Sequence, residues 1–417
     1  MKPGSSPEDR WPVLHVRVVA NAGGGPDKTI LRSPAHAPAR YPMAAAYLHP
    51  AGCAEIDTLA ERAAEHRCAF HAIPEHGPLD PIAVARLLGL CRRLGVRIWH
   101  AHDYKTNLLG RVVRRFHPMQ LVSTMHGFTG ETTRVRLYDK LDRWTLPRYD
   151  AVAAVSDRLY EQALRFGIGR DKLALIPNGV DIDDYQRTMT REQARLSIGL
   201  SPDRPVVVVL GRLSPEKGQD RAIQALAQLD VEHRQTELVL VGDGPCRVSL
   251  EQQARALGVA ERVRFAGWSA DPRPYLQAAD LLLLPSRTEG LPNAVLEAMA
   301  TGLAVAAAPV GATPEALDHG RAGCVLDQDP VGWPAALSML LSNDDRRARL
   351  AGAGQARARR FYGFDLRMHR MIDLYDRVTG ATPEQASLQS TQAGDAAARP
   401  AGCAVADQSD TPLRRAA

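Results

Sequence analysis

The chain has 417 residues, of which 45% are hydrophobic and 24% are charged, and its formal net charge is +5. This composition is typical of a soluble globular protein, and the length exceeds that of one ordinary core, so two domains and a tail are expected. The longest apolar runs are too short to span a membrane, and residues 1–12, which include Glu8 and Asp9, lack the apolar stretch of a signal peptide.

The spacing of the cysteines bears on the compartment. The six cysteines include no Cys-x-x-Cys pair, which favours free thiols in a reducing environment over structural zinc. We therefore expect a cytoplasmic protein.

Strand-like apolar runs alternate with helical periods along the whole chain. In the first half the expected strands are Leu14–Val19, Arg97–His100, Leu121–Thr124, Ala151–Val155 and Ala174–Ile176. In the second half they are Val206–Leu210, Leu238–Val241, Val263–Phe265, Leu281–Leu284, Ala304–Ala307 and Cys324–Leu326. Short strands separated by helices form parallel sheets covered on both faces, so each half predicts a doubly wound α/β domain.

The predicted boundaries follow from this pattern. We expect one Rossmann-like domain over residues 12–182 and a second over residues 183–364. A helix over residues 365–381 is expected to pack back on the first domain. Residues 382–417 are rich in Ala, Gln, Ser, Asp and Pro without a hydrophobic period, so they predict a disordered tail.

A glycine run, Gly23-Gly24-Gly25, follows the first expected strand. Glycine lets the backbone approach a ligand closely and accepts a positive φ, but many strand-to-helix turns hold glycines only in order to turn. Both interpretations stay open on the motif alone.

Positive charge is concentrated between Arg86 and Arg148, where thirteen lysines and arginines face four acids. This window is either a set of solvated helix faces or a basic surface that meets anionic lipid headgroups or an acidic acceptor. Nucleic acid is disfavoured, because we find neither interleaved aromatics nor a binding-module signature in the window.

The loop after Val206–Leu210 carries two cations, Arg212 and Lys217. It leaves the carboxyl end of a buried strand, where ligands bind in parallel sheets. Cations at the start of the following helix are unfavourable by about 0.3–1 kcal/mol each unless an anion lies between them. A diphosphate would supply that anion. The alternative is surface pairing with Glu216 and Asp220.

A second constellation follows the strand Leu281–Leu284. Pro292 suits the first helical position and Gly302 the end of the helix, so the helix begins at the sheet's carboxyl edge and presents free amides to an anion. Asn293 and Glu297 lie one turn apart on one face, and Glu297 can reach a polar group, such as a ribose diol, at the helix start.

Glu289 lies in the loop before this helix and can reach a neighbouring group, such as a sugar hydroxyl. The alternative for both glutamates is a carboxylate that complements the helix dipole. That alternative explains Glu289 well and Glu297 poorly.

Together these segments resemble family 4 of the retaining glycosyltransferases, whose GT-B fold sets two Rossmann-like domains about a cleft. The resemblance spans about residues 12–376. It is carried by the Glu289/Glu297 pair and by five further motifs in the family's order, which are Val155-Ser156, Ile176 to Asp181, Gly211 to Gly218, Val241 to Pro245 and Phe265 to Trp268.

The resemblance implies roles for the second domain, the donor side. Arg212 and Lys217 would hold the donor diphosphate, Glu297 the ribose and Glu289 the transferred sugar. The backbone of Gly290, Leu291, Asn293 and Ala294 would touch phosphate or sugar, although Pro292 has no amide to donate. Residues beside Gly267 would face the nucleobase. Trp268 is a candidate stacking surface, but a buried aromatic is the commoner outcome.

The resemblance also implies roles for the first domain, the acceptor side. Gly23, Gly24 and Gly25 would line the cleft near the transferred sugar, and His126 would contact the donor sugar or its phosphate. His102 is assigned to the acceptor side. We expect His100 to be a hydrogen-bonded structural residue. A metal at His100 and His102 is disfavoured, because no third ligand is placed nearby in the sequence.

The segment Asp181-Ile182-Asp183 matches the Asp-x-Asp manganese signature of the other glycosyltransferase fold. Here it lies in the connection between the domains, and Asp183 better suits a helix cap. We predict no metal and no cofactor.

The predicted function is retaining transfer of a sugar from a nucleotide-diphosphate sugar to an acceptor hydroxyl, with catalytic residues His126, Arg212, Lys217 and Glu289. The Leu291-Pro292-Asn293 variant resembles enzymes that build bacterial surface polysaccharides on lipid-linked carriers, which predicts a lipid-linked or polysaccharide intermediate of cell-envelope synthesis as the acceptor. The basic window Arg86–Arg148 would then make a peripheral contact with the inner membrane. The alternatives are a nucleotide-sugar epimerase, a non-catalytic sugar-nucleotide binder, and a glycoside hydrolase built on the two glutamates.

Overall fold

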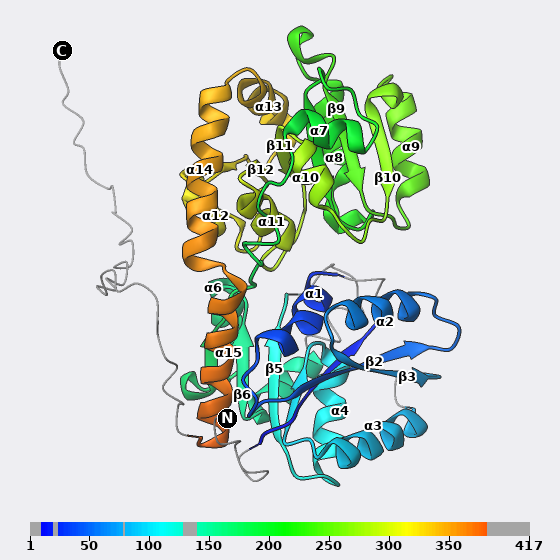
Figure 1. Ribbon diagram of the computed structural model, residues 1–417, viewed down its shortest axis with the longest axis vertical. Coiled ribbons are helices and arrows are strands. Elements are labelled where there is room, and N and C mark those ends of the chain that lie inside the picture. The colour runs from blue at the N-terminus through cyan, green and yellow to red at the C-terminus, as the bar shows by residue number, and fades with distance from the viewer. Residues whose placement is uncertain (1–9, 20–23, 78–79, 128–139, 382–417) are drawn as a thin grey trace, which may run out of the picture. The chain divides into compact units, whose positions relative to one another are not determined.

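We describe residues 10–19, 24–77, 80–127 and 140–381 of a computed structural model (Figure 1). Gly23 and the predicted tail lie outside the described residues. The described residues form two parallel sheets, one of seven strands and one of six. This confirms the predicted α/β class with two Rossmann-like sheets.

The first sheet has the strand order β3-β2-β1-β4-β5-β6-β7. Its strands are β1 (Val13–Val18), β2 (Met43–Pro50), β3 (Ala69–Glu75), β4 (Ile98–Ala101), β5 (Gln120–Met125), β6 (Ala151–Ala154) and β7 (Leu173–Leu175). Its helices are α1 (Gly25–Arg32), α2 (Glu55–Glu65), α3 (Pro81–Leu94), α4 (Tyr104–Arg114) and α6 (Asp157–Arg165). All pairings are parallel, so the carboxyl ends of the strands meet at one edge.

Helices cover both faces of this sheet because the side chains of each strand alternate. On β2, Ala44, Ala46 and Leu48 belong to the apolar cluster that contains α3 and α4. Ala45 and Tyr47 belong to the cluster that contains α1 and α2. The strand is therefore buried on both faces, as a central parallel strand requires.

Two strands, β2 and β3, were not predicted. The run Ala44-Ala45-Ala46 has a high helix propensity, which hides β2. Strand β3 lies at the edge of the sheet and carries His71, Pro74 and Glu75, which interrupt any apolar pattern. Only burial between two helical layers decides that β2 is extended.

The second sheet has the order β10-β9-β8-β11-β12-β13. Its strands are β8 (Val206–Leu210), β9 (Glu237–Val241), β10 (Val263–Gly267), β11 (Leu281–Leu284), β12 (Ala304–Ala307) and β13 (Cys324–Val325). Its helices are α7 (Arg191–Ser197), α8 (Gln219–Ala227), α9 (Arg247–Ala256), α10 (Arg273–Ala278), α11 (Asn293–Thr301), α12 (Thr313–Ala316), α13 (Trp333–Leu341) and α14 (Asp344–Phe361).

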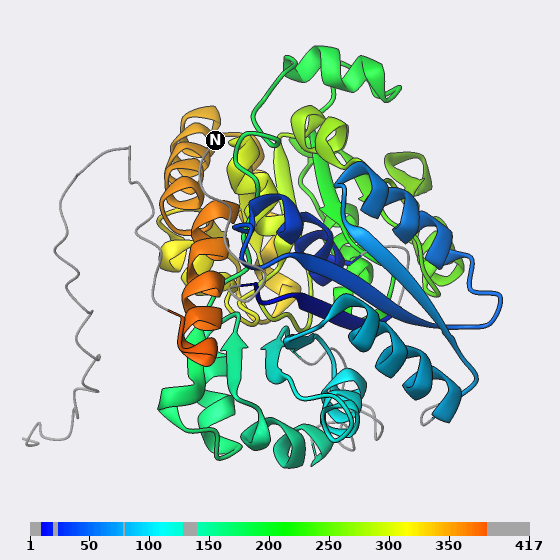
Figure 2. The same ribbon diagram turned by 60° about the horizontal axis from the view of Figure 1, so that its bottom comes forward.

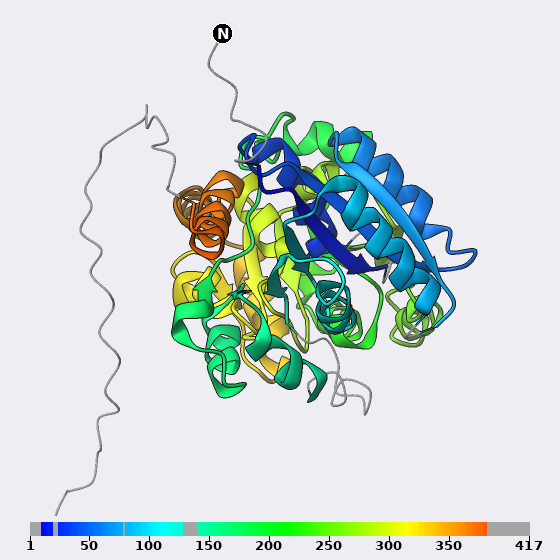
Figure 3. The ribbon, with the colours of Figure 1, turned by 90° about the horizontal axis from the view of Figure 1, so that it is seen from below.

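The last described helix, α15 (Phe364–Thr379), packs on the first sheet. Its Met368, Met371 and Tyr375 share an apolar cluster with Val13 of β1 and Val122 of β5. In Figure 2 the orange α15 runs beside the green strands of this sheet, and in Figure 3 it lies across the strands from the cyan helix α4. The sequence-based domain boundaries themselves stay predictions.

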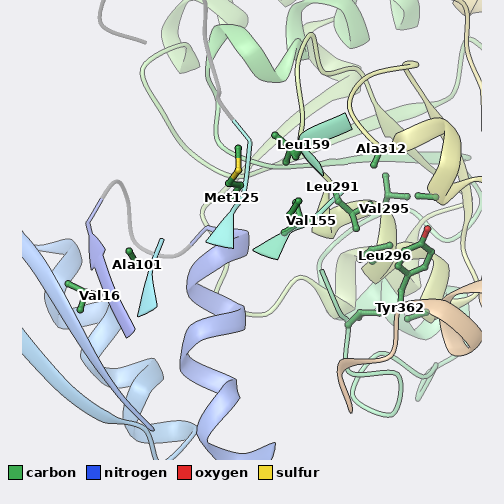
Figure 4. Packing of buried hydrophobic residues seen from close by; sticks show 14 of the residues in the cluster. Val16, Ala101, Met125, Val155, Leu159, Leu291, Val295, Leu296, Ala312 and Tyr362 are labelled. Carbon is green, nitrogen blue, oxygen red and sulfur yellow. The ribbon is translucent and has the colours of Figure 1, made fainter. Parts of the chain in front are cut away.

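One apolar cluster joins residues of both sheets. Met125 and Leu159 from the first sheet's side belong to the same buried cluster as Leu291, Val295 and Ala312 from the second, and Figure 4 shows these side chains together. The segments of the two sheets are therefore held together by shared apolar packing.

Candidate functional site

A cleft of about 730 Å³ opens at the carboxyl edges of both sheets. Its volume falls within the usual range for small-molecule sites, about 300–1,000 Å³. The lining comes mainly from the segments that follow β1, β4, β5, β8, β9, β10 and β11, and Glu55, Asp142 and Asn178 add to it. Parallel strands bring these loops to one edge, which is where ligands bind in such sheets.

Most of the predicted site residues line this cleft. They are Gly24, Gly25, His102, His126, Arg212, Lys217, Glu289, Gly290, Leu291, Asn293, Ala294 and Glu297. Gly267 does not line the cleft, although its neighbours Trp268 and Ser269 do. The structure thus brings together predicted residues from the segments that follow five strands, β1, β4, β5, β8 and β11, while their individual roles stay predictions.

Lys217 meets Glu289 on the wall formed by the second sheet. The Lys217 ammonium donates to a carboxylate oxygen of Glu289 at 2.7 Å, and the Ser286 hydroxyl donates to the same oxygen at 2.8 Å. The Glu289 side chain is almost wholly buried, whereas that of Lys217 is 26% exposed. The lysine is therefore held at the cleft surface by a buried carboxylate.

The alternative surface pairing of the two cations is wrong. Glu216 accepts from the Ser214 hydroxyl at 2.6 Å, and Asp220 pairs with Arg287 at 2.6 Å. Arg212 is exposed and lines the cleft, and no ion pair to it is found in the described part of the chain. One cation of the predicted clamp is therefore open to an incoming anion.

Helix α11 starts in the cleft one residue later than predicted. Pro292 has an extended backbone (φ −74°, ψ 120°) and is the N-cap, so the first helical residue is Asn293. Gly302 ends the helix in the left-handed conformation (φ 69°), as predicted. The side-chain amide of Asn293 donates to the carbonyl of Gly25 at 3.1 Å, which ties the helix start to the glycine run.

Lys28 is a cleft residue that was missed as a site residue. It lies in α1, and its ammonium donates to a Glu297 carboxylate oxygen at 2.6 Å and to the Tyr185 hydroxyl at 3.3 Å. Its place in the first turn after the glycine run was the available signal. A ribose that reaches Glu297 must share this carboxylate with Lys28.

His126 and His102 are hydrogen-bonded to each other at 3.0 Å, and both line the cleft. His100 is fully buried and contacts the Tyr375 hydroxyl at 2.6 Å and the Thr124 hydroxyl at 2.8 Å, as expected of a structural histidine. Burial lowers the pKa of each of these three imidazoles well below its usual value, so they are neutral near pH 7.

Contrary to the prediction, a third potential metal ligand does lie near His100 and His102. His15 of β1 approaches both, and one ring nitrogen from each of the three lies within 4.8 Å of the others. Both nitrogens of His100 and both of His102 already have hydrogen-bond partners, however.

Asp181 of the Asp-x-Asp segment already has partners within the protein. Asp181 pairs with Arg32 at 3.1 Å, and its carboxylate accepts from the amides of Asp183 and Asp184 at 3.1 and 3.2 Å. Asp181 rather than Asp183 is therefore the capping residue, and it caps a turn rather than a helix.

Two expectations about aromatic residues are also corrected. Trp268 is 45% exposed and lines the cleft, so it is not the buried aromatic that was expected. In the basic window, Phe116 is 61% and Trp144 is 49% exposed, so aromatics do lie among the cations there.

Comparisons with known proteins agree with this arrangement. The model of the family described as Glycosyltransferase Family 4 matches residues 15–184, and that described as Glycosyl transferases group 1 matches residues 204–343.

Two curated relatives illustrate the sequence similarity. The chain is 34% identical to a GDP-mannose-dependent alpha-(1-6)-phosphatidylinositol monomannoside mannosyltransferase of Mycolicibacterium smegmatis, over 66% of the chain and 75% of the relative. It is 33% identical to a D-inositol 3-phosphate glycosyltransferase of Xylanimonas cellulosilytica, over 56% of the chain. The match spans only 58% of the length of that second relative.

Solved structures share the fold. The Anabaena protein HepE, crystallised with UDP-glucose, superposes with a TM-score of 0.75 at 23% identity, over 88% of this chain and all of HepE. The apo form of the lipopolysaccharide outer core galactosyltransferase WaaB superposes with a TM-score of 0.64 at 17% identity, over 88% of this chain and 99% of WaaB. Two Rossmann-like sheets about a shared cleft are the GT-B fold, and with these matches the chain belongs to family 4 of the glycosyltransferases.

Proposed function

We propose that the protein transfers a sugar, with retention of configuration, from a nucleotide-diphosphate sugar to an acceptor hydroxyl. The observation that carries the proposal is that Lys217, Arg212 and the open amino end of α11 lie on one wall of the cleft. Two cations and free helix amides form a site for a diphosphate.

The chemistry follows from the charges. As the bond to the anomeric carbon breaks, negative charge grows on the leaving phosphate, and Arg212, Lys217 and the helix amides stabilise it. Glu289 orients the transferred sugar, Glu297 the ribose, and His126 contacts the sugar or its phosphate. The leaving phosphate itself takes the proton of the acceptor hydroxyl on the same face of the sugar. Closure of the two walls excludes water and prevents hydrolysis of the donor.

The substrates are proposed by class. The related mannosyltransferase is named for GDP-mannose, and HepE was crystallised with UDP-glucose. Proteins of this fold are therefore associated with nucleotide-diphosphate sugars that carry guanine or uracil. The curated relatives are named for inositol-containing acceptors, whereas the sequence suggested a lipid-linked intermediate of a surface polysaccharide. We propose a glycan or lipid-linked acceptor hydroxyl in cell-envelope synthesis. The matched family and relatives carry transferase names, which gives no support to the epimerase.

A donor screen followed by a transfer assay tests this function. Nucleotide diphosphates and their sugars are first ranked by the rise in melting temperature, because a ligand that binds the native state stabilises it. The best donor is then incubated with candidate acceptors. We expect a glycosylated product with the donor's anomeric configuration. Hydrolysis of a simple glycoside without a nucleotide sugar would instead support a hydrolase.

We further propose that the transfer requires no metal. Within the Asp-x-Asp segment, Asp181 is already paired with Arg32 and Asp183 accepts from the Gln186 side chain. The diphosphate has cationic side chains for partners. The transfer rate in excess chelator is therefore expected to equal that in buffer. A rate that falls in chelator and returns with manganese would contradict this.

We also propose a peripheral contact with the cytoplasmic face of an anionic membrane. No helix in the described ranges is long and apolar enough to cross a bilayer. The exposed rings of Phe116 and Trp144 lie among arginines, with the Arg111 guanidinium 4.1 Å and the Arg148 guanidinium 5.0 Å from the centre of the Trp144 ring. Exposed aromatics flanked by cations suit the interface of an anionic bilayer.

Flotation with vesicles tests this contact. The protein is expected to float with phosphatidylglycerol-containing vesicles and not with phosphatidylcholine vesicles, and Phe116→Ala with Trp144→Ala should abolish most of the binding. Val231→Ala, which removes a side chain that is 71% exposed on the other domain, is the matched control and should float like the wild type. Equal flotation of the double variant and the control would show that Phe116 and Trp144 do not mediate binding to the vesicles.

A further inference from the structure

Three histidine rings form a hydrogen-bonded line that leads from the interior of the first sheet to the cleft. His15 lies in β1, His102 follows β4 and His126 follows β5, and these strands are neighbours in the sheet. The His126 Nε2 and His102 Nδ1 atoms are 3.0 Å apart, and the His102 Nε2 and His15 Nδ1 atoms are 2.9 Å apart. Both nitrogens of the central ring are therefore used within the line.

The two ends of the line differ in their surroundings. At one end the Nδ1 atom of His126, a residue that lines the cleft, is buried and has no partner among the described residues. At the other end the Nε2 atom of His15 is also buried without a partner in that part of the chain, and His15 does not line the cleft. Of the two nitrogens, only the first belongs to a residue that a ligand in the cleft can contact.

Each ring carries one proton, because burial lowers the pKa of all three, that of His15 to about 3. A neutral imidazole donates through one nitrogen and accepts through the other. Three such rings in a line must all donate in the same direction. The line therefore has two states, one that donates toward the cleft and one that donates away from it.

The surroundings of His15, at the interior end of the line, favour one of these two states. If the line donates away from the cleft, the Nε2 of His15 carries a buried N–H that nothing in the cleft can reach, and such orphaned donors are rare in folded proteins. If it donates toward the cleft, the same nitrogen presents a lone pair. In this other state the terminal N–H belongs to His126, a residue that lines the cleft.

We propose that His15 and His102 are positioning residues that hold the proton of His126 on Nδ1, so that the cleft receives a fixed N–H donor. This rests on the proposed function for its consequence, in which the N–H meets an oxygen of the donor substrate. A lone pair at the same place would repel a phosphate oxygen, which has no proton to donate. A donor that is oriented before the substrate arrives needs no rearrangement during the reaction.

A spectroscopic measurement tests the line without substrate or activity. The full chain is labelled with ¹⁵N-histidine, the His126 signals are assigned by their loss in His126→Gln, and the nitrogen shifts report which nitrogen is protonated. We expect the proton on Nδ1 in the wild type. A proton on Nε2 would overturn the inference while leaving the proposed function standing.

Three variants test the kinetic consequence. His15→Leu leaves the central ring without its interior donor, so kcat is expected to fall about tenfold with little change in the KM for the sugar nucleotide. His15→Asn, which keeps an N–H near the position of Nδ1, should restore most of kcat. His100→Leu is the matched control, because it removes an equally buried imidazole that stacks on His102, with ring centres 4.5 Å apart, but lies outside the line.

His100→Leu is expected to lower the melting temperature about as much as His15→Leu while keeping kcat near that of the wild type. Equal losses of kcat in the two leucine variants, or no recovery in His15→Asn, would assign His15 a packing role only and overturn the inference.

Discussion

Lys217→Ala is expected to lower kcat/KM for the donor by about 100-fold or more. A charge-assisted hydrogen bond to a phosphate contributes about 1.5–3 kcal/mol, and removal of one donor aimed at developing charge costs about 10²–10³ in kcat. In addition, the substitution leaves the buried carboxylate of Glu289 without its cation, facing an anionic ligand. Steady-state kinetics with varied donor measure the effect, and kinetics near those of the wild type would remove the cationic clamp from the mechanism.

The double variant Lys217→Ala with Glu289→Gln separates the two causes. If the uncompensated carboxylate accounts for much of the loss in donor affinity, the double variant should bind the nucleotide diphosphate more tightly than Lys217→Ala alone. Turnover should not recover, because the cation that we propose stabilises the leaving phosphate is still absent. Recovered turnover would mean that Lys217 serves only to neutralise Glu289.

Gly290→Ala is expected to reduce kcat by about 100-fold while nucleotide diphosphate binding weakens much less. A Cβ atom at this position would collide with the carbonyl oxygen of His126, which belongs to the opposite wall of the cleft. The two walls must then separate, and a displacement of about 1 Å between reacting groups can cost about 10²-fold in rate. Binding of the nucleotide diphosphate, which we propose involves mainly the second domain, is less sensitive to that separation.

Gly352→Ala provides the control for Gly290→Ala. It adds the same methyl group within α14, where nothing lies within 4 Å of the new atom. Its activity should match that of the wild type, and its stability should rise slightly because alanine favours the helix. Unchanged kcat in Gly290→Ala would show that catalysis does not require the close approach of Gly290 to His126.

Local signals in the sequence were sufficient for much of the second domain. The Val206–Leu210 and Leu281–Leu284 runs have the length and composition of buried strands, and the turns after them hold the residues that line the cleft. Gly302 ends α11 as predicted because only a residue that tolerates positive φ suits that position.

Tertiary packing decided what the local signals could not. An alanine run became strand β2 because two helical layers bury it, and Pro292 became a cap rather than the first helical residue. The partners of the predicted site residues also come from distant segments. Lys28 lies 269 positions from Glu297, and no periodicity or motif relates two side chains so far apart in the chain.

The sequence by itself determined the α/β class, the cationic loop with its Lys217, and the helix start beside Glu289, because each depends on residues within one or two turns of each other. Only the tertiary structure decided that Lys28 pairs with Glu297 and that His15 joins His102 and His126. Those contacts arise where neighbouring strands and facing loops meet, and the chain order of parallel strands separated by helices does not state which side chains will touch.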